Sequence, residues 1–209
     1  METVIISGDD LSFAVEVILR GGLVAVPTET VYGLAGNGLD ANAVARIYEV
    51  KGRPAIKPLS LLVPGLDFAK AVCATIPKSA YILAEAFWPG PLTIVLPRSD
   101  GVPDIVTAGL DTVGVRCPDH PKTLEFLRLA GVPTAAPSAN ISDLPSPKSA
   151  EDVLSYFDGK IDCIIDGGVC ALGVESTLVR LSSDSGFYKI LRQGALAEED
   201  IKNALESFR

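Results

Sequence analysis

The segment with the clearest capacity for chemistry is the basic loop KGRPAIKPLS. It carries the cations Lys51, Arg53 and Lys57, and prolines at positions 54 and 58 stiffen it. A stiff loop loses little conformational entropy when it closes on an anion. Arginine offers a bidentate fork and lysine a compact charge, so a triphosphate would engage both kinds of cation. The loop therefore predicts phosphate binding, with a solvated basic turn as the alternative.

Polar side chains also gather where predicted strands end or begin. They are Thr28, Glu29, Thr30, Arg116, Ser138, Asn140, Ser146, Glu175, Ser176 and Arg192. Ligands of layered α/β proteins bind in crevices at strand ends. Any one of these clusters could be an ordinary turn, but the cations of the separate loops have few acids nearby in sequence to pair with. We therefore expect a ligand cavity, in which the Ser138 hydroxyl and the Asn140 amide suit phosphate oxygens or a ribose.

Several other reaction classes are disfavoured by what the sequence lacks. The segment GNGLDA fits the loose dinucleotide pattern GxGxxA, but it is not expected to follow a strand directly, and Ser60 stands where an acid is required. His120 is the only histidine and is expected to be a cap or turn residue, so a Ser-His-Asp triad or a histidine-rich metal site is nearly excluded. Catalysis then depends on positioning, electrostatics or a metal carried by the substrate, as in a nucleotidyl-type reaction.

The composition predicts a folded, acidic protein. Among 209 residues, 48% are hydrophobic and 21% charged, the net charge is −8 and the pI is near 4.7. Proteins that bind nucleic acid through their own surface usually carry the opposite sign. The apolar runs are too short to cross a bilayer, the cysteines form no CxxC motif, and the first residues do not look like an export signal. We expect reduced thiols, no membrane association, a cytoplasmic location and one domain over residues 1–209.

The elements that must position these residues alternate between helices and strands. Helices are predicted over residues 10–19, 41–50, 67–74, 78–87, 121–131, 149–157 and 198–208. Strands are predicted over residues 23–26, 58–63, 92–97, 112–118, 132–137, 161–166, 176–181 and 187–192. Asp40 is expected to cap the second helix, and Ser149 with Asp152 the sixth. Strands that follow one another directly indicate a mixed sheet, so the fold class is α/β with helices layered on a mixed sheet.

Taken together, these segments resemble the YrdC-type family of threonylcarbamoyl-AMP synthases. The resemblance is carried by AVPTETVYGLAGN, KGRPAIKPLSLLV, FWPGPLTIVL, DTVGVRCPDHP, VPTAAPSANISDLPSP, IIDGGVCALGVESTLV and ILRQGAL, in the family's order and over nearly the whole chain. The family implies a three-layer YrdC/RibB-like fold, in which helices flank a mixed, twisted sheet around a large open cavity. It also implies that L-threonine, bicarbonate and ATP form threonylcarbamoyl-AMP and pyrophosphate, the first step of tRNA threonylcarbamoyladenosine modification.

The resemblance also implies the site residues by their positions. Those implied at L-threonine are Thr30, Arg116, Ala136 and Ser176. Those implied to act in catalysis are Lys51 and Arg53. Those implied at ATP are Arg53, Lys57, Thr112, Ser138, Asn140, Ser146 and Arg192. Arg116 would clamp the threonine carboxylate as a bidentate fork, and Mg²⁺ would accompany ATP without dedicated protein ligands.

Two positions depart from the family pattern, and some alternatives stay open. Leu62 stands where some members carry a histidine near threonine, and Gln193 replaces a frequent proline. Some relatives carry a further C-terminal domain, whereas this chain resembles the single-domain form. A hand-off to tRNA threonylcarbamoyl-transferase proteins is implied, and direct tRNA binding is expected to be weak or absent. The alternatives are a non-catalytic RNA-binding module, which the acidic charge disfavours, and an enzyme of the related dihydroxybutanone-phosphate synthase fold, which one histidine serves poorly.

Overall fold

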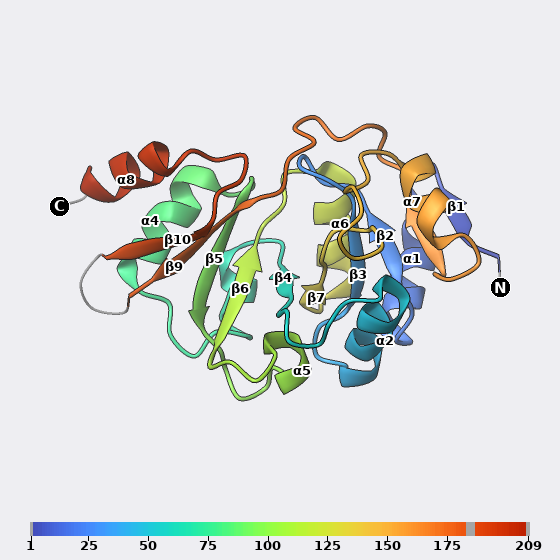
Figure 1. The fold of residues 1–209 in the computed structure, drawn as a ribbon, viewed down its shortest axis with the longest axis horizontal. Coiled ribbons are helices and arrows are strands. Elements are labelled where there is room, and N and C mark those ends of the chain that lie inside the picture. The colour runs from blue at the N-terminus through green and yellow to red at the C-terminus, as the bar shows by residue number, and fades with distance from the viewer. Residues whose placement is uncertain (1, 183–186, 208–209) are drawn as a thin grey trace.

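The fold is built on one mixed sheet, which the computed structural model describes over residues 2–182 and 187–207 (Figure 1). Its strands are β1 (Val4–Ile6), β2 (Val24–Val26), β3 (Gly33–Asn37), β4 (Ser60–Leu62), β5 (Leu92–Pro97), β6 (Thr112–Arg116), β7 (Thr134–Ala135), β8 (Cys163–Ile165), β9 (Thr177–Leu181) and β10 (Tyr188–Arg192). The helices are α1 (Ser12–Leu19), α2 (Ala41–Lys51), α3 (Leu66–Ala69), α4 (Lys78–Phe87), α5 (Asp104–Thr107), α6 (Pro121–Ala130), α7 (Ala150–Phe157) and α8 (Glu198–Glu206).

The order of the strands confirms the predicted mixed sheet. Across the sheet they run β1-β8-β2-β3-β7-β4-β6-β5-β9-β10. The pairs β1–β8, β2–β8, β4–β6 and β5–β9 are parallel, and the other neighbours are antiparallel. In this register Arg116, the last residue of β6, lies opposite Leu62 at the end of β4. Figure 1 shows the segment between β8 and β9 (orange) crossing between the two halves of the molecule.

Helices cover both faces of β2, so the architecture has three layers. Val24 and Val26 belong to one buried cluster with residues of α1 and α6. Ala25, between them, joins a second buried cluster with residues of α2 and α7. Because successive side chains of a strand point to opposite faces, these clusters lie on the two sides of the sheet. The three-layer arrangement expected from the resemblance is confirmed.

Local signals set the ends of the helices that lead to the site. Asp40 caps α2 by accepting a hydrogen bond from the backbone N–H of Asn42 at 2.9 Å, and the predicted capping box opens α7. Helix α2 ends at Gly52, whose φ of 59° is left-handed backbone that favours glycine. This turn takes the next residue, Arg53, out of the helical path and to the cavity described below.

Some short segments differ from the predicted elements. Strands β1 and β3 and helix α5 are not among the predictions, and α3 is shorter than the helix predicted over residues 67–74. Strand β3 has the glycine-containing sequence GLAGN, and pairing with β2 and β7 overrides its weak strand propensity. The segment GNGLDA therefore does begin inside a strand, but Gly38 is packed tightly against Leu61 and the carbonyl of Pro133. Residue 208 of the last predicted helix lies outside the described residues.

Within residues 2–182 and 187–207, no helix combines the length and the apolar character that a bilayer span requires.

Candidate active site

A cavity of about 420 Å³ opens over β4, β5 and β9. Ser60 and Leu62 of β4 are two residues apart and so face the same side. Thr93 of β5 and Leu178 of β9 lie opposite each other in the register and continue this wall. The predicted site residues that line the cavity are Thr30, Arg53, Lys57, Arg116, Ala136, Ser138, Ser176 and Arg192. The structure thus brings together residues from six separate parts of the sequence in one cavity.

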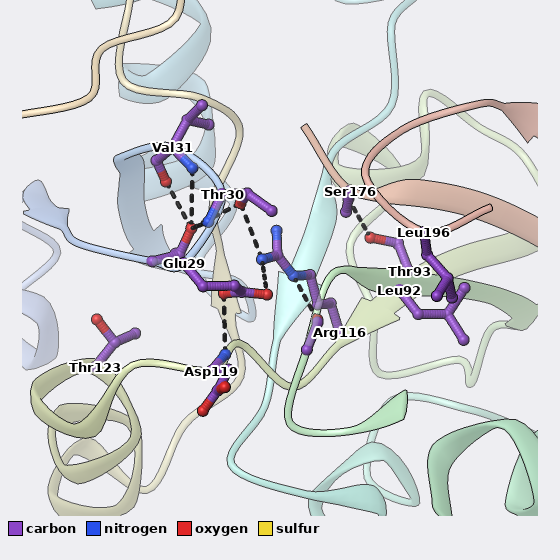
Figure 2. A network of polar contacts seen from close by, with 12 residues as sticks. Glu29, Thr30, Val31, Leu92, Thr93, Arg116, Asp119, Thr123, Ser176 and Leu196 are labelled. Carbon is purple, nitrogen blue, oxygen red and sulfur yellow. Dashed lines mark hydrogen bonds and ion pairs between the residues drawn. The ribbon is translucent and has the colours of Figure 1, made fainter. Parts of the chain in front are cut away.

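Arg116 lies at one end of the cavity, with most of its donors already engaged (Figure 2). Its Nη2 donates to Oε1 of Glu29 at 2.8 Å and to Oγ1 of Thr30 at 2.9 Å, and its Nε donates to the carbonyl of Gly90 at 3.2 Å. The side chains of Arg116 and Glu29 are only 9% and 11% exposed. Burial lowers the pKa of Arg116, and the charge of Glu29 opposes that shift. In Figure 2 the remaining nitrogen, Nη1, points between Thr30 and Ser176.

In this arrangement Arg116 offers no free pair of nitrogens for the predicted bidentate clamp. A fork needs two neighbouring guanidinium nitrogens with free hydrogens. Nη2 and Nε of Arg116 donate to the protein, so an anionic ligand can contact only Nη1. This contact through the single terminal nitrogen is called end-on below.

Paired hydroxyls flank Arg116. Thr28 Oγ1 and Thr30 Oγ1 are 2.7 Å apart, and Thr28 donates to a backbone carbonyl, so Thr30 donates to Thr28. Across the cavity Thr93 Oγ1 and Ser176 Oγ are 2.8 Å apart. All four hydroxyl side chains are buried. This end of the cavity therefore suits a small polar ligand that carries one carboxylate.

The basic loop presents Arg53 and Lys57 to the cavity. Arg53 ties its own loop, because its Nε donates to the carbonyl of Lys57 at 3.2 Å and its Nη2 to that of Pro58 at 3.0 Å. Burial lowers the pKa of Arg53. Lys57 Nζ lies 3.3 Å from Oδ1 of Asp143 in an exposed pair, which contributes little to stability. Among the ion pairs of the described chain none involves Arg53, so its charge can act on a ligand.

Arg192 reaches the cavity from the end of β10. It forms an ion pair with Glu175, and its Nη2 donates to the carbonyl and to Oγ of Ser176 at 2.9 Å and 3.2 Å. Glu175 also accepts a hydrogen bond from Ser146 Oγ at 3.4 Å. Arg192 therefore connects the basic side of the cavity to the hydroxyl of Ser176, whereas Ser146 is held by Glu175 and does not line the cavity.

Lys51, which is predicted to act in catalysis, does not line the cavity. It is 1% exposed, and its Nζ donates to the carbonyls of Ser138 and Asn140, both at 2.5 Å, and to Oδ1 of Asn140 at 3.3 Å. Burial, assisted by the charge of Arg53, lowers the pKa of Lys51 to about 8. An ammonium has three N–H donors, and acceptors of the protein surround all of them. Lys51 lies behind the cavity wall and shapes it.

Two further residues predicted at ATP also lie outside the cavity lining. The side chain of Asn140 accepts from the Ser138 hydroxyl at 2.6 Å and donates to a backbone carbonyl at 2.5 Å. Thr112 begins β6, at the opposite end of that strand from Arg116. The polar groups of the Asn140 side chain therefore bond within the protein, and Thr112 is not among the residues that line the cavity.

Several residues that line the cavity are not among the predicted site residues. Ser60 and Thr93 are single hydroxyls within the apolar runs PLSLLV and LTIVLP, and this interruption is the signal that could have revealed them. Tyr32 also lines the cavity, while its hydroxyl donates to the carbonyl of Gly168. Of the two departures from the family pattern, Leu62 forms an apolar part of the wall. Gln193 donates to two backbone carbonyls of the following turn, which ties that loop.

His120 lies outside the cavity. It is the N-cap residue of α6, as predicted, although its side chain makes no capping hydrogen bond. Its Nδ1 is buried and has no partner within the described residues, and its ring packs against Gly167. Burial lowers the pKa of His120. In residues 2–182 and 187–207, no group of His, Cys, Asp and Glu side chains is placed to hold a metal ion.

Comparisons with known proteins point to one family. A family model described as telomere recombination, Sua5/YciO/YrdC, matches residues 16–194. A threonylcarbamoyl-AMP synthase of Pyrococcus abyssi is 50% identical over 192 residues, which cover 92% of this chain and 56% of that protein. One of Bacillus subtilis is 43% identical over 190 residues, covering 90% and 54%. The chain spans about half the length of these relatives.

A solved structure matches the fold closely. The crystal structure of P. abyssi Sua5 complexed with L-threonine has a TM-score of 0.93 and 48% sequence identity to this chain. The match covers 97% of this chain and 61% of that one.

Proposed function

The chain belongs to the Sua5/YciO/YrdC family, and from that premise we propose that it acts as a threonylcarbamoyl-AMP synthase, a nucleotidyltransferase. It would join L-threonine, bicarbonate and ATP and release pyrophosphate, in the first step of tRNA threonylcarbamoyladenosine formation. The observation that carries the proposal is one cavity with two unlike ends. A buried guanidinium among hydroxyls forms one end, and a proline-stiffened basic loop forms the other.

L-Threonine suits the end of the cavity that holds Arg116. Nη1 of Arg116 would donate to the substrate carboxylate, and the hydroxyls of Thr30 and Ser176 are placed for its polar groups. The backbone N–H of Ala136 donates to the carbonyl of Ser60. The carbonyl of Ala136 would therefore be the group that accepts a hydrogen bond from the substrate amine. The apolar side chain of Leu62 offers a surface for the threonine methyl group.

ATP suits the opposite end. Arg53 and Lys57 would contact phosphates, with Ser138 and Arg192 at the nucleotide. Lys57 and Arg192 are each paired with a carboxylate, so these cations offset only part of the charge of a triphosphate. Mg²⁺ that arrives bound to ATP would offset more of it.

The protein's task in this reaction is alignment and charge neutralisation. The threonine amine would form a carbamate with carbon dioxide derived from bicarbonate. A carbamate oxygen would then attack the α-phosphorus as the bond to pyrophosphate breaks. Both reactants are anionic, so cations at each end of the cavity must bring them together. Arg116 would hold the amino acid, and Arg53 with Lys57 would hold the leaving phosphates.

Incubation with MgATP, bicarbonate and L-threonine tests the proposal. We expect mass spectrometry to detect threonylcarbamoyl-AMP, and pyrophosphate release to require L-threonine. Equal pyrophosphate release with and without L-threonine would overturn the proposed acceptor. An RNA-binding module would instead bind RNA at moderate salt without turnover, and turnover of a sugar phosphate would indicate the dihydroxybutanone-phosphate synthase alternative.

The product needs a recipient. A mixed anhydride of a carbamate and AMP hydrolyses readily, so it must pass quickly to an acceptor. We propose that tRNA threonylcarbamoyl-transferase proteins receive it, and that this chain binds tRNA weakly because its net charge of −8 repels phosphates. Filter binding of tRNA to this chain, with and without such a transferase, measures the difference.

A further inference from the structure

Glu29 carries a carboxylate that is 11% exposed and whose two oxygens both face donors of the protein (Figure 2). Oε1 accepts from Nη2 of Arg116 at 2.8 Å, and Oε2 accepts from the backbone N–H of Asp119 at 3.0 Å. The backbone carbonyl of Glu29 accepts from the N–H of Leu172 at 2.8 Å. Glu29 thereby joins the β2–β3 loop to the end of β6 and to the segment before β9. Arg116 lines the cavity and Glu29 does not, so Glu29 would act on a ligand through Arg116.

The orientation of Arg116 depends on this contact. Glu29 and Thr30 hold Nη2, and Gly90 holds Nε. Nη1 is then the nitrogen that reaches the cavity. Without the carboxylate, Nη2 would lose its charged partner, and the guanidinium could turn to offer two nitrogens at once.

Glu29 also sets the charge that a ligand meets. Opposite charges 2.8 Å apart in a partly buried pair largely cancel each other's field at a distance, so this end of the cavity is not a general anion site. A simple carboxylate is attracted by Arg116 and repelled by Glu29. A zwitterionic amino acid also carries an ammonium, which Glu29 attracts.

We propose that Glu29 is a positioning residue that holds Arg116 end-on and makes the site prefer a zwitterionic amino acid to a simple carboxylate. This inference rests on the proposed function, because it takes L-threonine as the ligand of Arg116.

Three variants separate the two effects of Glu29. Glu29→Gln keeps the shape and removes the charge, and its amide can satisfy either Arg116 or Asp119 but not both, because it has one acceptor oxygen. Glu29→Asp keeps the charge but is one methylene shorter. The matched control is Asp67→Asn, which removes a carboxylate from an ion pair with Lys70 whose acidic side chain is 90% exposed.

Calorimetric titration of each variant with L-threonine and with (R)-3-hydroxybutyrate, the analogue that lacks the amine, tests the proposal. We expect Glu29→Gln to weaken L-threonine about tenfold and to lower the preference for L-threonine over the analogue by a similar factor. Asp67→Asn should change neither value. A purely structural role would weaken both ligands alike, so an unchanged preference in Glu29→Gln would overturn the proposal.

Two further outcomes are distinguishable. If Glu29→Gln does not fold, Glu29→Asp decides. Its carboxylate is withdrawn by one methylene, so L-threonine must weaken more than the analogue, and equal weakening of the two ligands would overturn the proposal. If the unaltered protein does not bind L-threonine at all, the proposed substrate is wrong, and the inference about Glu29 fails with it.

Discussion

The ammonium of Lys51 lies 2.5 Å from the backbone carbonyl of Asn140, although the two residues are 89 positions apart in the sequence. The same ammonium holds the carbonyl of Ser138. A cation of the basic loop therefore shapes the segment that carries the Ser138 hydroxyl to the cavity. The neighbouring cation Arg53 lines the cavity together with Lys57, so these two cations of the loop can act on a ligand.

Lys51→Met should destabilise the fold and weaken ATP together. Methionine fills similar space but donates no hydrogen bond, so buried acceptors lose their partner at about 1–3 kcal/mol each. We expect the free energy of unfolding to fall by about 2 kcal/mol or more, measured by urea denaturation alongside an ATP titration. Lys70→Met, at an exposed lysine, is the control. Unchanged stability with lost ATP binding would instead indicate a direct phosphate contact by Lys51.

Arg53→Ala should weaken ATP with little effect on folding. It removes a charge-assisted contact to phosphate of about 1.5–3 kcal/mol, or roughly tenfold to a hundredfold in ATP affinity. The hydrogen bonds that the side chain makes in the protein go only to carbonyls of its own loop. Isothermal titration with ATP and a melting curve measure both effects. A large fall in melting temperature at unchanged ATP affinity would make Arg53 a structural residue.

Arg116→Lys should raise the KM for L-threonine about tenfold and leave the KM for ATP within about twofold. Glu29 and the carbonyl of Gly90 accept from different nitrogens of the planar guanidinium. A lysine offers one nitrogen at one point, so it cannot keep these partners and also place a donor where Nη1 of Arg116 lies. Because the carboxylate is charged before the reaction starts, kcat should fall less than kcat/KM. Steady-state kinetics with each substrate varied test this. Equal weakening of both substrates would contradict separate ends of the cavity.

The stability of the fold should depend on pH through His120. Burial holds its folded-state pKa below the ordinary value of 6.5. Between these two values the unfolded chain binds more protons, so the free energy of unfolding rises with pH up to about 6.5 and falls as the pH drops below it. Urea denaturation at about pH 5.5 and pH 7 measures the slope, which His120→Asn should flatten. The same slope in both proteins would show that other groups cause it.

Helices and strands whose signals lie in residues adjacent in the sequence were predictable. The helix predicted over 78–87 and the strand predicted over 92–97 coincide with α4 and β5, because apolar spacing and proline boundaries are local signals. The Asp40 cap and the capping box of α7 are local in the same way. Strand β3 was not predictable, because its glycine-containing sequence becomes a strand only through pairing with β2 and β7.

The candidate site likewise has features that are local in the sequence and features that depend on distant contacts. The sequence by itself determined that cations and hydroxyls stand at strand ends and on a stiff loop, which is a matter of residue type and neighbours. Only the tertiary structure decided which of those groups face a ligand. Arg116 meets Glu29 across 87 positions, and Lys51 meets Ser138 across 87 as well. Such partners are brought together by sheet register and helix packing. As a result Lys51 lies behind the cavity wall, Arg116 offers a ligand only one nitrogen, and the charge of Arg53 faces the cavity without a carboxylate partner among the described ion pairs.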